Sequence, residues 1–181
     1  MLHAVMTTRS KNPTKMSRTW GPAEVYAAAG VPRGVAHSWI ARQLIPLPPG
    51  PGMGKERRFS FLDAMCVAVV AELTKLGFVV GSASYAAGML VRSGDSGIRS
   101  LNEEGWTLVI APSLAPAGTE APRMSAMSLV KAESPEDMRK FIEAEYSKFT
   151  SLVLVDVSGI ARRMRERLGE GTAEPGATAE G

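Results

Sequence analysis

Apolar residues recur at helical spacing near the start of the chain, in residues 22–29. Val25 and Ala28 lie three positions apart and so share one face of a helix. Pro22 suits a first helical position, and Gly30, which has no side chain, suits a C-terminal cap. The pattern predicts a short helix that buries Val25 and Ala28 and ends near Gly30.

A second periodic run follows directly, in residues 32–43. Val31, Val35 and Trp39 recur every four residues, so we expect them to share the inward face of a second helix. Gly34 costs a helix about 1 kcal/mol relative to Ala, so we expect another backbone to approach closely there. Two helices joined by a tight glycine-containing turn form the outline of a helix-turn-helix, whose second helix enters the major groove of DNA. The exposed side of this helix carries basic and small residues, namely Arg33, Gly34, His37, Ser38 and Arg42.

The next stretch consists of two extended segments around a flexible centre. Residues 44–47 and 55–61 flank a run rich in glycine and proline, which predicts a β-hairpin with a long tip. We interpret this hairpin as a wing that is anchored by aromatic residues and that projects the cations Lys55, Arg57 and Arg58. Because neighbouring residues on a strand point to opposite faces, we expect one of Arg57 and Arg58 to contact DNA and the other to brace the wing.

Two further helices are expected before residue 93. Residues 62–76, capped by Ser60 or Asp63, carry apolar residues on more than one face, so this helix should be covered on more than one side. Residues 82–92 are rich in small side chains that permit close packing. Cys66 lies on the apolar helix and is expected to be a buried small hydrophobe, since a redox sensor would need exposure and nearby cations.

The second half of the chain has a different texture. A β-branched and aromatic run begins at Trp106 and is expected to stop at Pro112, and a continuous apolar strand near the end of the chain is expected to be buried on both sides. Ser134, followed by Pro135 and by a carboxylate at Asp137, predicts a helix start. The expected order is β-β-α-β-α: strands at 106–111 and 124–131, a helix to about 149, a strand at 151–157 and a basic helix at 160–168.

A set of residues between 20 and 78 occurs in a characteristic order. They are Val25, Gly30-Val31, Trp39-Ile40, Leu44-Ile45-Pro46, Arg57-Arg58-Phe59-Ser60, Asp63 and Leu76-Gly77-Phe78. In this order and spacing the segment resembles the N-terminal DNA-binding domain of the MerR family and related excisionase-like winged helix-turn-helix domains. The resemblance implies that Arg33, Gly34, His37 and Ser38 face bases or adjacent phosphates, and that Lys55, Arg57 and Arg58 contact phosphate or the minor groove.

The chain departs from this family after its fourth helix. MerR proteins dimerise through an antiparallel coiled coil that follows the DNA-binding domain, whereas no long helix is expected here. The second half is therefore expected to provide dimerisation or another function.

The expected fold class is α+β, with an N-terminal winged helix-turn-helix domain, helical with a β-hairpin wing, and a small β-β-α-β-α domain after it. The expected boundaries are a flexible basic arm at 1–18, the MerR-like domain at 19–93, a linker at 94–104, a small α/β dimerisation, effector or partner domain at 105–168, and a disordered tail at 169–181.

Positive charge is concentrated in the first third of the chain. Residues 1–60 contain nine Lys and Arg against two Asp and Glu, whereas residues 101–181 contain nine against thirteen. A local excess of positive charge is the electrostatic footprint of nucleic-acid binding. The four cations of the arm fit a solvated tail equally well, and the basic run at 162–167 fits either a solvated helix face or a second contact with DNA or a partner.

Composition argues against several other classes. One cysteine and two histidines exclude an internal disulfide and a multi-cysteine zinc site. With no run of about eighteen apolar residues and no signal-peptide centre near the N-terminus, we expect a cytoplasmic protein without membrane association. The sequence lacks a phosphate loop with lysine, an HExxH motif and a nucleophile elbow, so we expect no enzyme and no cofactor. Asp156 is the one carboxylate placed where α/β proteins put chemistry.

Together these patterns favour a bacterial-type, sequence-specific regulator of transcription that binds double-stranded DNA as a homodimer, with RNA polymerase or a recombinase as a further contact. An excisionase-like or architectural DNA-binding accessory protein of phage or recombination machinery is the alternative. A third hypothesis is that the second half binds a small effector or a protein partner.

Overall fold

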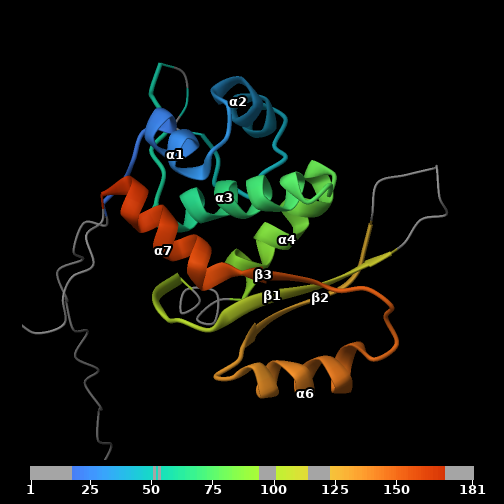
Figure 1. The fold of residues 1–181 in the computed structure, drawn as a ribbon. Helices are drawn as coiled ribbons and strands as arrows, with labels where there is room; N and C mark the ends of the chain where they lie inside the picture. The colour runs from blue at the N-terminus through green and yellow to red at the C-terminus, as the bar shows by residue number, and fades with distance from the viewer. Residues whose placement is uncertain (1–17, 51, 53, 94–100, 114–122, 170–181) are drawn as a thin grey trace, which may run out of the picture.

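The computed structural model describes residues 18–50, 52, 54–93, 101–113 and 123–169. In this part of the chain the fold is mixed α+β, with six helices and a three-stranded antiparallel sheet (Figure 1). The helices are α1 (Pro22–Ala29), α2 (Arg33–Ala41), α3 (Phe61–Lys75), α4 (Val80–Arg92), α6 (Pro135–Tyr146) and α7 (Val157–Leu168), and the strands are β1 (Trp106–Ser113), β2 (Arg123–Lys131) and β3 (Val153–Asp156). Most of the expected arm, linker and tail lies outside the described residues.

The elements form layers on the two faces of the sheet. Figure 1 shows α3, α4 and α7 above the sheet, α6 below it, and α1 and α2 on the far side of α3. Helix α6 packs over the sheet through a separate small cluster around Tyr146, Val109 and Ala111. The end of the molecule that carries α2 is therefore remote from the face that α6 covers.

The sheet has the order β2-β1-β3, so β1 is its central strand. Leu108 pairs with Leu129 on one side and with Val155 on the other. Leu108 and Ile110 join the cluster beneath α3 and α7, whereas Val109 and Ala111 face α6. This alternation follows from the two-residue period of a strand and buries β1 on both faces.

Helix α3 is the core helix, and it begins with a reciprocal cap. The Ser60 hydroxyl accepts a hydrogen bond from the Asp63 amide at 3.2 Å, and the Asp63 carboxylate accepts one from the Ser60 amide at 2.9 Å. These two bonds satisfy backbone donors that a helix start leaves free. Nine residues of α3 are buried, Cys66 among them, which confirms that this helix is covered on more than one side.

Helix α7 ties the sheet to the N-terminal helices. Its Ser158 hydroxyl accepts a hydrogen bond from the Trp106 amide at 2.9 Å, and its Arg167 guanidinium donates to the Ala28 carbonyl at 2.8 Å. Ile160 and Met164 join the buried cluster that also contains Val25 of α1. The N-terminal helices and one face of the sheet therefore share a single hydrophobic core.

Two expectations about the strands are wrong. Strand β1 does not stop at Pro112, because an irregularity in register between Ala111 and Pro112 lets pairing continue to Ser113. Strand β3 is not buried on both sides; it is an edge strand, and the side chain of Leu154 is 49% exposed. An apolar run shows how much surface a strand can bury, but its position in the sheet decides how much is covered.

We expect Gly105→Ala to lower the free energy of unfolding by about 1–3 kcal/mol, the cost of holding an alanine in a strained conformation. Gly105 has φ +83°, and a Cβ there would lie 2.7 Å from the carbonyl oxygen of Ala132. Urea denaturation measures the change. The control is Gly81→Ala in α4, where a Cβ meets nothing within 4 Å and where alanine should stabilise by about 0.5–1 kcal/mol. Equal unfolding free energies for Gly105→Ala and the parent chain would contradict this account.

Candidate nucleic-acid interface

A tight turn joins α1 to α2. Gly30 adopts the left-handed conformation with φ 66°, as expected for the cap of α1, and its amide donates to the Ala27 carbonyl at 3.1 Å. The Val31 amide donates to the Tyr26 carbonyl at 2.9 Å. Because Pro32 already acts as the N-cap of α2, the two helices are held in a fixed relation by very little chain.

The inward face of α2 differs from the predicted one. Ala36 is fully buried, whereas Val35 is 41% exposed, so the expectation that Val35 faces the core is wrong. Val31 is buried but precedes the helix, so it does not share a helical face with Val35 and Trp39. Trp39 is partly buried and packs against the core, as its neighbour Ile40 does.

The predicted outward face of α2 is exposed. A Cβ at Gly34 would meet nothing within 4 Å, so the predicted close approach of another backbone is absent among the described residues. Open space beside this glycine leaves room for an outside partner. The exposed residues are Arg33, Gly34, His37, Ser38 and Arg42.

Residues 44–60, which we call the proline loop, do not form the predicted β-hairpin. In the described part of the loop, Phe59 makes an isolated bridge with Trp20, through amide-to-carbonyl bonds of 3.0 and 2.9 Å. The first arm contains prolines, which have no amide proton to donate to a ladder. The return segment instead pairs with the residues just before α1.

Aromatic side chains anchor the proline loop to the core. Phe59 is fully buried and meets Tyr26 edge to face, with ring centroids 6.1 Å apart. Trp20 is 1% exposed and meets Phe61 in the same way at 6.2 Å. The anchoring role predicted for aromatic residues is confirmed, although their partners lie outside the loop.

Arg57 and Arg58 each brace a different segment. The Arg57 guanidinium donates to the Pro48 carbonyl at 3.0 Å across the loop and lies 6.0 Å from the centroid of the Phe59 ring. Arg58 donates to the Thr19 carbonyl at 2.7 Å. Arg58 is exposed and Arg57 is partly buried, so both guanidinium groups remain at or near the surface.

Two of the predicted cations influence the pKa of the same tyrosine, Tyr26. Burial raises the pKa of Tyr26, and the positive charges of Arg57 and Arg33 partly offset that rise. A cation from the proline loop and one from α2 therefore lie within electrostatic reach of one point. Among the described residues, Arg33, Arg42 and Lys55 form no hydrogen bond or ion pair through their side chains.

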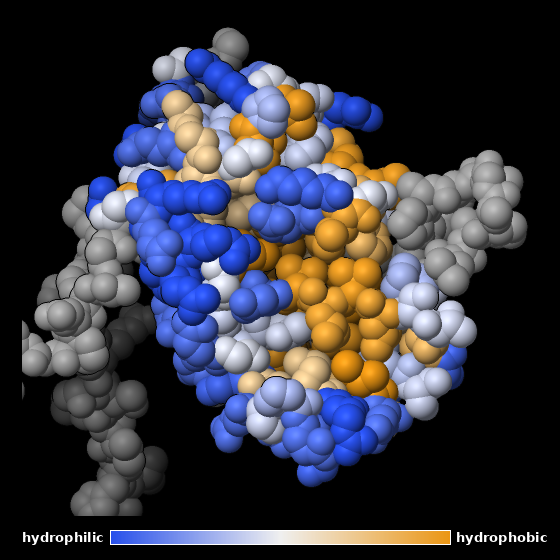
Figure 2. Space-filling model, viewed as in Figure 1, coloured by the Kyte–Doolittle hydropathy of each residue, from blue (hydrophilic) through white to orange (hydrophobic). Residues whose placement is uncertain are grey.

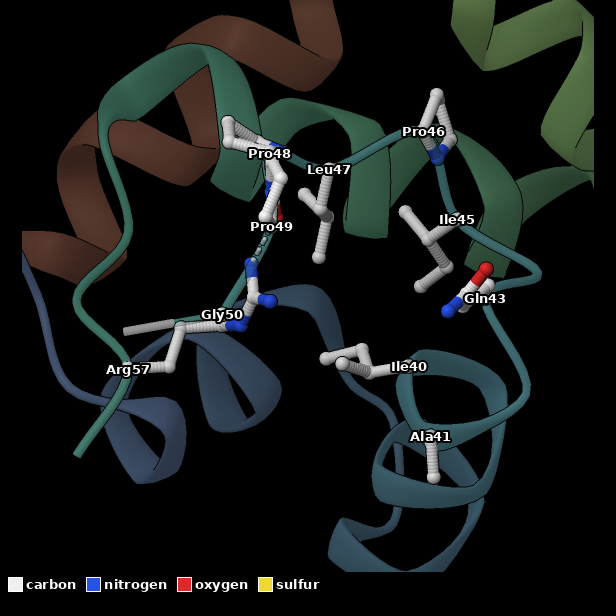
Figure 3. Close-up of a pocket in the computed structure, with 10 residues that line it drawn as sticks. All are labelled: Ile40, Ala41, Gln43, Ile45, Pro46, Leu47, Pro48, Pro49, Gly50 and Arg57. Atoms are coloured by element: carbon white, nitrogen blue, oxygen red, sulfur yellow. Dashed lines mark hydrogen bonds between the residues drawn. The ribbon is translucent and has the colours of Figure 1, made fainter. Parts of the chain in front are cut away.

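A pocket of about 470 Å³ separates the end of α2 from the proline loop (Figure 3). Figure 3 shows Arg57 reaching across the pocket to Pro48, with Ile40 and Leu47 on its walls. Gln43 also lines the pocket. Its φ is 54°, and among the described non-glycine residues it alone has a positive φ. A left-handed conformation costs a non-glycine residue about 1–2 kcal/mol. The sequence pattern did not single out Gln43, because nothing local distinguishes it from an ordinary helix end.

Other groups that the sequence singled out have structural partners. Asp156 is the N-cap of α7, and its carboxylate accepts a hydrogen bond from the Gly159 amide at 2.7 Å. Arg162 in the basic run forms an ion pair with Glu104 at 2.9 Å. In the described residues no group of three or more His, Cys, Asp or Glu is placed to hold a metal ion. No described helix has the length and apolar character needed to cross a membrane.

The Cys66 thiol should make stability depend on pH in alkaline solution. Burial, reinforced by Asp63, raises its pKa from 9.0 to about 12. Between these values the unfolded thiol loses its proton while the folded one keeps it, so the free energy of unfolding falls as pH rises through this window. The slope reaches at most about 1.4 kcal/mol per pH unit. Denaturant titrations should show a shallower pH dependence for Cys66→Ala; the same slope in both proteins would contradict the assignment.

Comparison with known proteins provides no family for this chain. No protein-family model matches the sequence, and no curated protein matches it at a significant level.

Proposed function

We propose that this chain is a sequence-specific transcriptional regulator that binds double-stranded DNA with a MerR-like winged helix-turn-helix. Helix α2 enters the major groove, and the proline loop acts as the wing on the flanking backbone. The observation that carries the proposal is that the end of α2, beside exposed Arg42, and the proline loop, with Arg57, line the same pocket, so the helix and the loop can contribute to one cationic surface. Duplex DNA is the polyanion that such a surface fits.

The composition of the exposed face of α2 supports base reading. Recognition helices contact base edges mainly with residues near their N-terminus, which is where Arg33 and His37 lie one turn apart. Arginine bonds well to the acceptor edge of guanine, and an apolar side chain suits the thymine methyl group. Exposed Val35 offers that apolar contact. Gly34 and Ser38 are small enough to let the helix approach the groove closely.

The remaining cations serve affinity in this proposal. We assign phosphate contacts beside the groove to Lys55, Arg57 and Arg58 of the proline loop and to Arg42 at the end of α2, all of which lie at or near the surface. Phosphate contacts position a protein on DNA but carry no sequence information directly. One small module buries too little surface for tight specific binding, so we propose that two copies bind a pseudo-palindromic site in the cytoplasm.

The double variant Arg33→Gln/Arg42→Gln should weaken binding to a mixed-sequence duplex and flatten its salt dependence. Each lost phosphate contact lowers the slope of log K against log salt by about 0.9. Fluorescence anisotropy across a salt series gives both quantities. The control that removes the same charge is Arg139→Gln/Lys140→Gln on α6, beyond the sheet (Figure 1), where both side chains are exposed and form ion pairs with Glu136. If the α2 double variant and the α6 control both keep the salt slope of the parent chain, α2 is not part of the DNA interface.

Two kinds of variant distinguish the charge of Arg57 from its hydrogen bond to the Pro48 carbonyl. Arg57→Ala/Arg58→Ala should reduce affinity about tenfold, which corresponds to about 1.4 kcal/mol, and should flatten the salt slope. Arg57→Lys keeps the charge, so it should retain the slope of the parent chain. Circular dichroism establishes that each variant is folded. If the double alanine variant keeps the parental affinity and slope, the proline loop is not a wing.

A further inference from the structure

The pocket between the end of α2 and the proline loop combines apolar walls with one cation. Its volume of about 470 Å³ is typical of a site for a small molecule. Ile45 is buried, Ile40 and Leu47 are half-buried, and all three line the pocket together with prolines of the loop. Figure 3 shows the Arg57 guanidinium on one side of this space and Gln43 on the other. Apolar walls with a few polar groups are the usual form of a ligand site.

The proline loop itself holds Arg57 at the pocket. The Arg57 Nη1 donates to the Pro48 carbonyl at 3.0 Å, and a Cβ on Gly50 would lie 3.2 Å from Nη2. Gly50 therefore lets the guanidinium lie close against the loop. In the described part of the chain no carboxylate lies within ion-pair distance of Arg57. A guanidinium has five N–H donors, and it binds a carboxylate well because two of them can donate in parallel.

The opposite side of the pocket contains a strained residue. Gln43 follows α2, and its amide donates to the Ile40 carbonyl at 2.9 Å. The Leu44 amide donates to the Trp39 carbonyl at 2.8 Å. These two bonds form the helix end that glycine usually completes, in the left-handed conformation that Gln43 adopts here. Glycine would form this turn without strain but would place no amide side chain at the pocket. Strain that is retained beside a pocket points to a use for the side chain.

We propose that this pocket binds a small organic acid, a monocarboxylate with an apolar ring or branched chain. The carboxylate pairs with Arg57, and the apolar part lies against Ile40, Ile45 and Leu47. The site goes beyond the proposed function and does not depend on it. In the proposed function Arg57 also meets a phosphate, so the acid and the duplex compete for one cation, and only this consequence rests on that function.

The charge and the walls of the pocket together specify the class of ligand. An inorganic anion would satisfy Arg57 but would leave the apolar walls in contact with water. A neutral hydrocarbon would cover those walls but would leave the charge of Arg57 without a partner. A molecule with one carboxylate and an apolar body satisfies both parts of the pocket at once.

An amide NMR titration of the full chain, without DNA, tests the proposal with para-tert-butylbenzoate. The dissociation constant should be on the order of 1 mM for a ligand of this size. Shift changes should concentrate at the pocket, in residues 40–50 and at 57. The neutral para-tert-butylbenzamide has the same shape, and acetate has the charge without the apolar body. Each of these two should bind about tenfold more weakly than the acid.

A second apolar surface makes this mapping decisive. Figure 2 shows it alongside α4 and the sheet, where it offers a hydrophobic molecule a competing place to bind. Shift changes that concentrate on α4 and the sheet would overturn the proposal. Equal affinities for the acid and the amide, or no saturable binding of the acid, would overturn it as well.

Two variants locate the bound acid. Arg57→Gln should weaken the binding of para-tert-butylbenzoate about tenfold, because it removes the charge from the pocket. Leu47→Trp fills the pocket from a half-buried position and leaves Arg57 in place, so it should also weaken binding. The matched control is Arg33→Gln, which removes the same charge from exposed α2 outside the pocket and should keep the parental affinity. Thermal melts verify that each variant is folded. Parental affinity in either pocket variant overturns the proposal.

Discussion

The structure depends on the junction that Trp20 makes between three segments far apart in the sequence. Its backbone bridges Phe59, and its indole N–H donates to the Leu168 carbonyl at 3.2 Å. Trp20 and Phe59 are both buried, so the junction excludes water where the proline loop, α1 and the end of α7 meet. A buried indole requires an acceptor, and the C-terminus of α7 has free carbonyl groups to supply one.

This junction explains how a loop without a β-ladder can present cations in fixed positions. The buried Phe59 holds the return segment, and Arg57 closes the loop onto Pro48. The charges at the surface are therefore carried by a rigid core rather than by a hydrogen-bonded hairpin. The same core continues through α3 and α7 to the sheet, so the proposed DNA surface and the sheet are built on one hydrophobic cluster.

The features that the sequence predicted correctly depend on local signals. The glycine cap after α1, the Ser134 cap of α6 and the cap of α3, which the sequence narrowed to Ser60 or Asp63, each act within a few residues, so these helices were placed well. The exposed residues of α2 followed from polarity alone. The errors at Val35, in the hairpin and at β3 arose from long-range packing, because neither the Trp20–Phe59 bridge nor the position of a strand at a sheet edge has a local signature.

The most direct test of the central claim is an amide NMR titration of the full chain with a mixed-sequence duplex at low ionic strength. The account predicts that shift changes concentrate in residues 33–42 and 55–58, with the aromatic junction otherwise undisturbed. Changes confined to α6 and the sheet, or no change at any duplex concentration, would contradict the claim that α2 and the proline loop form one surface for DNA.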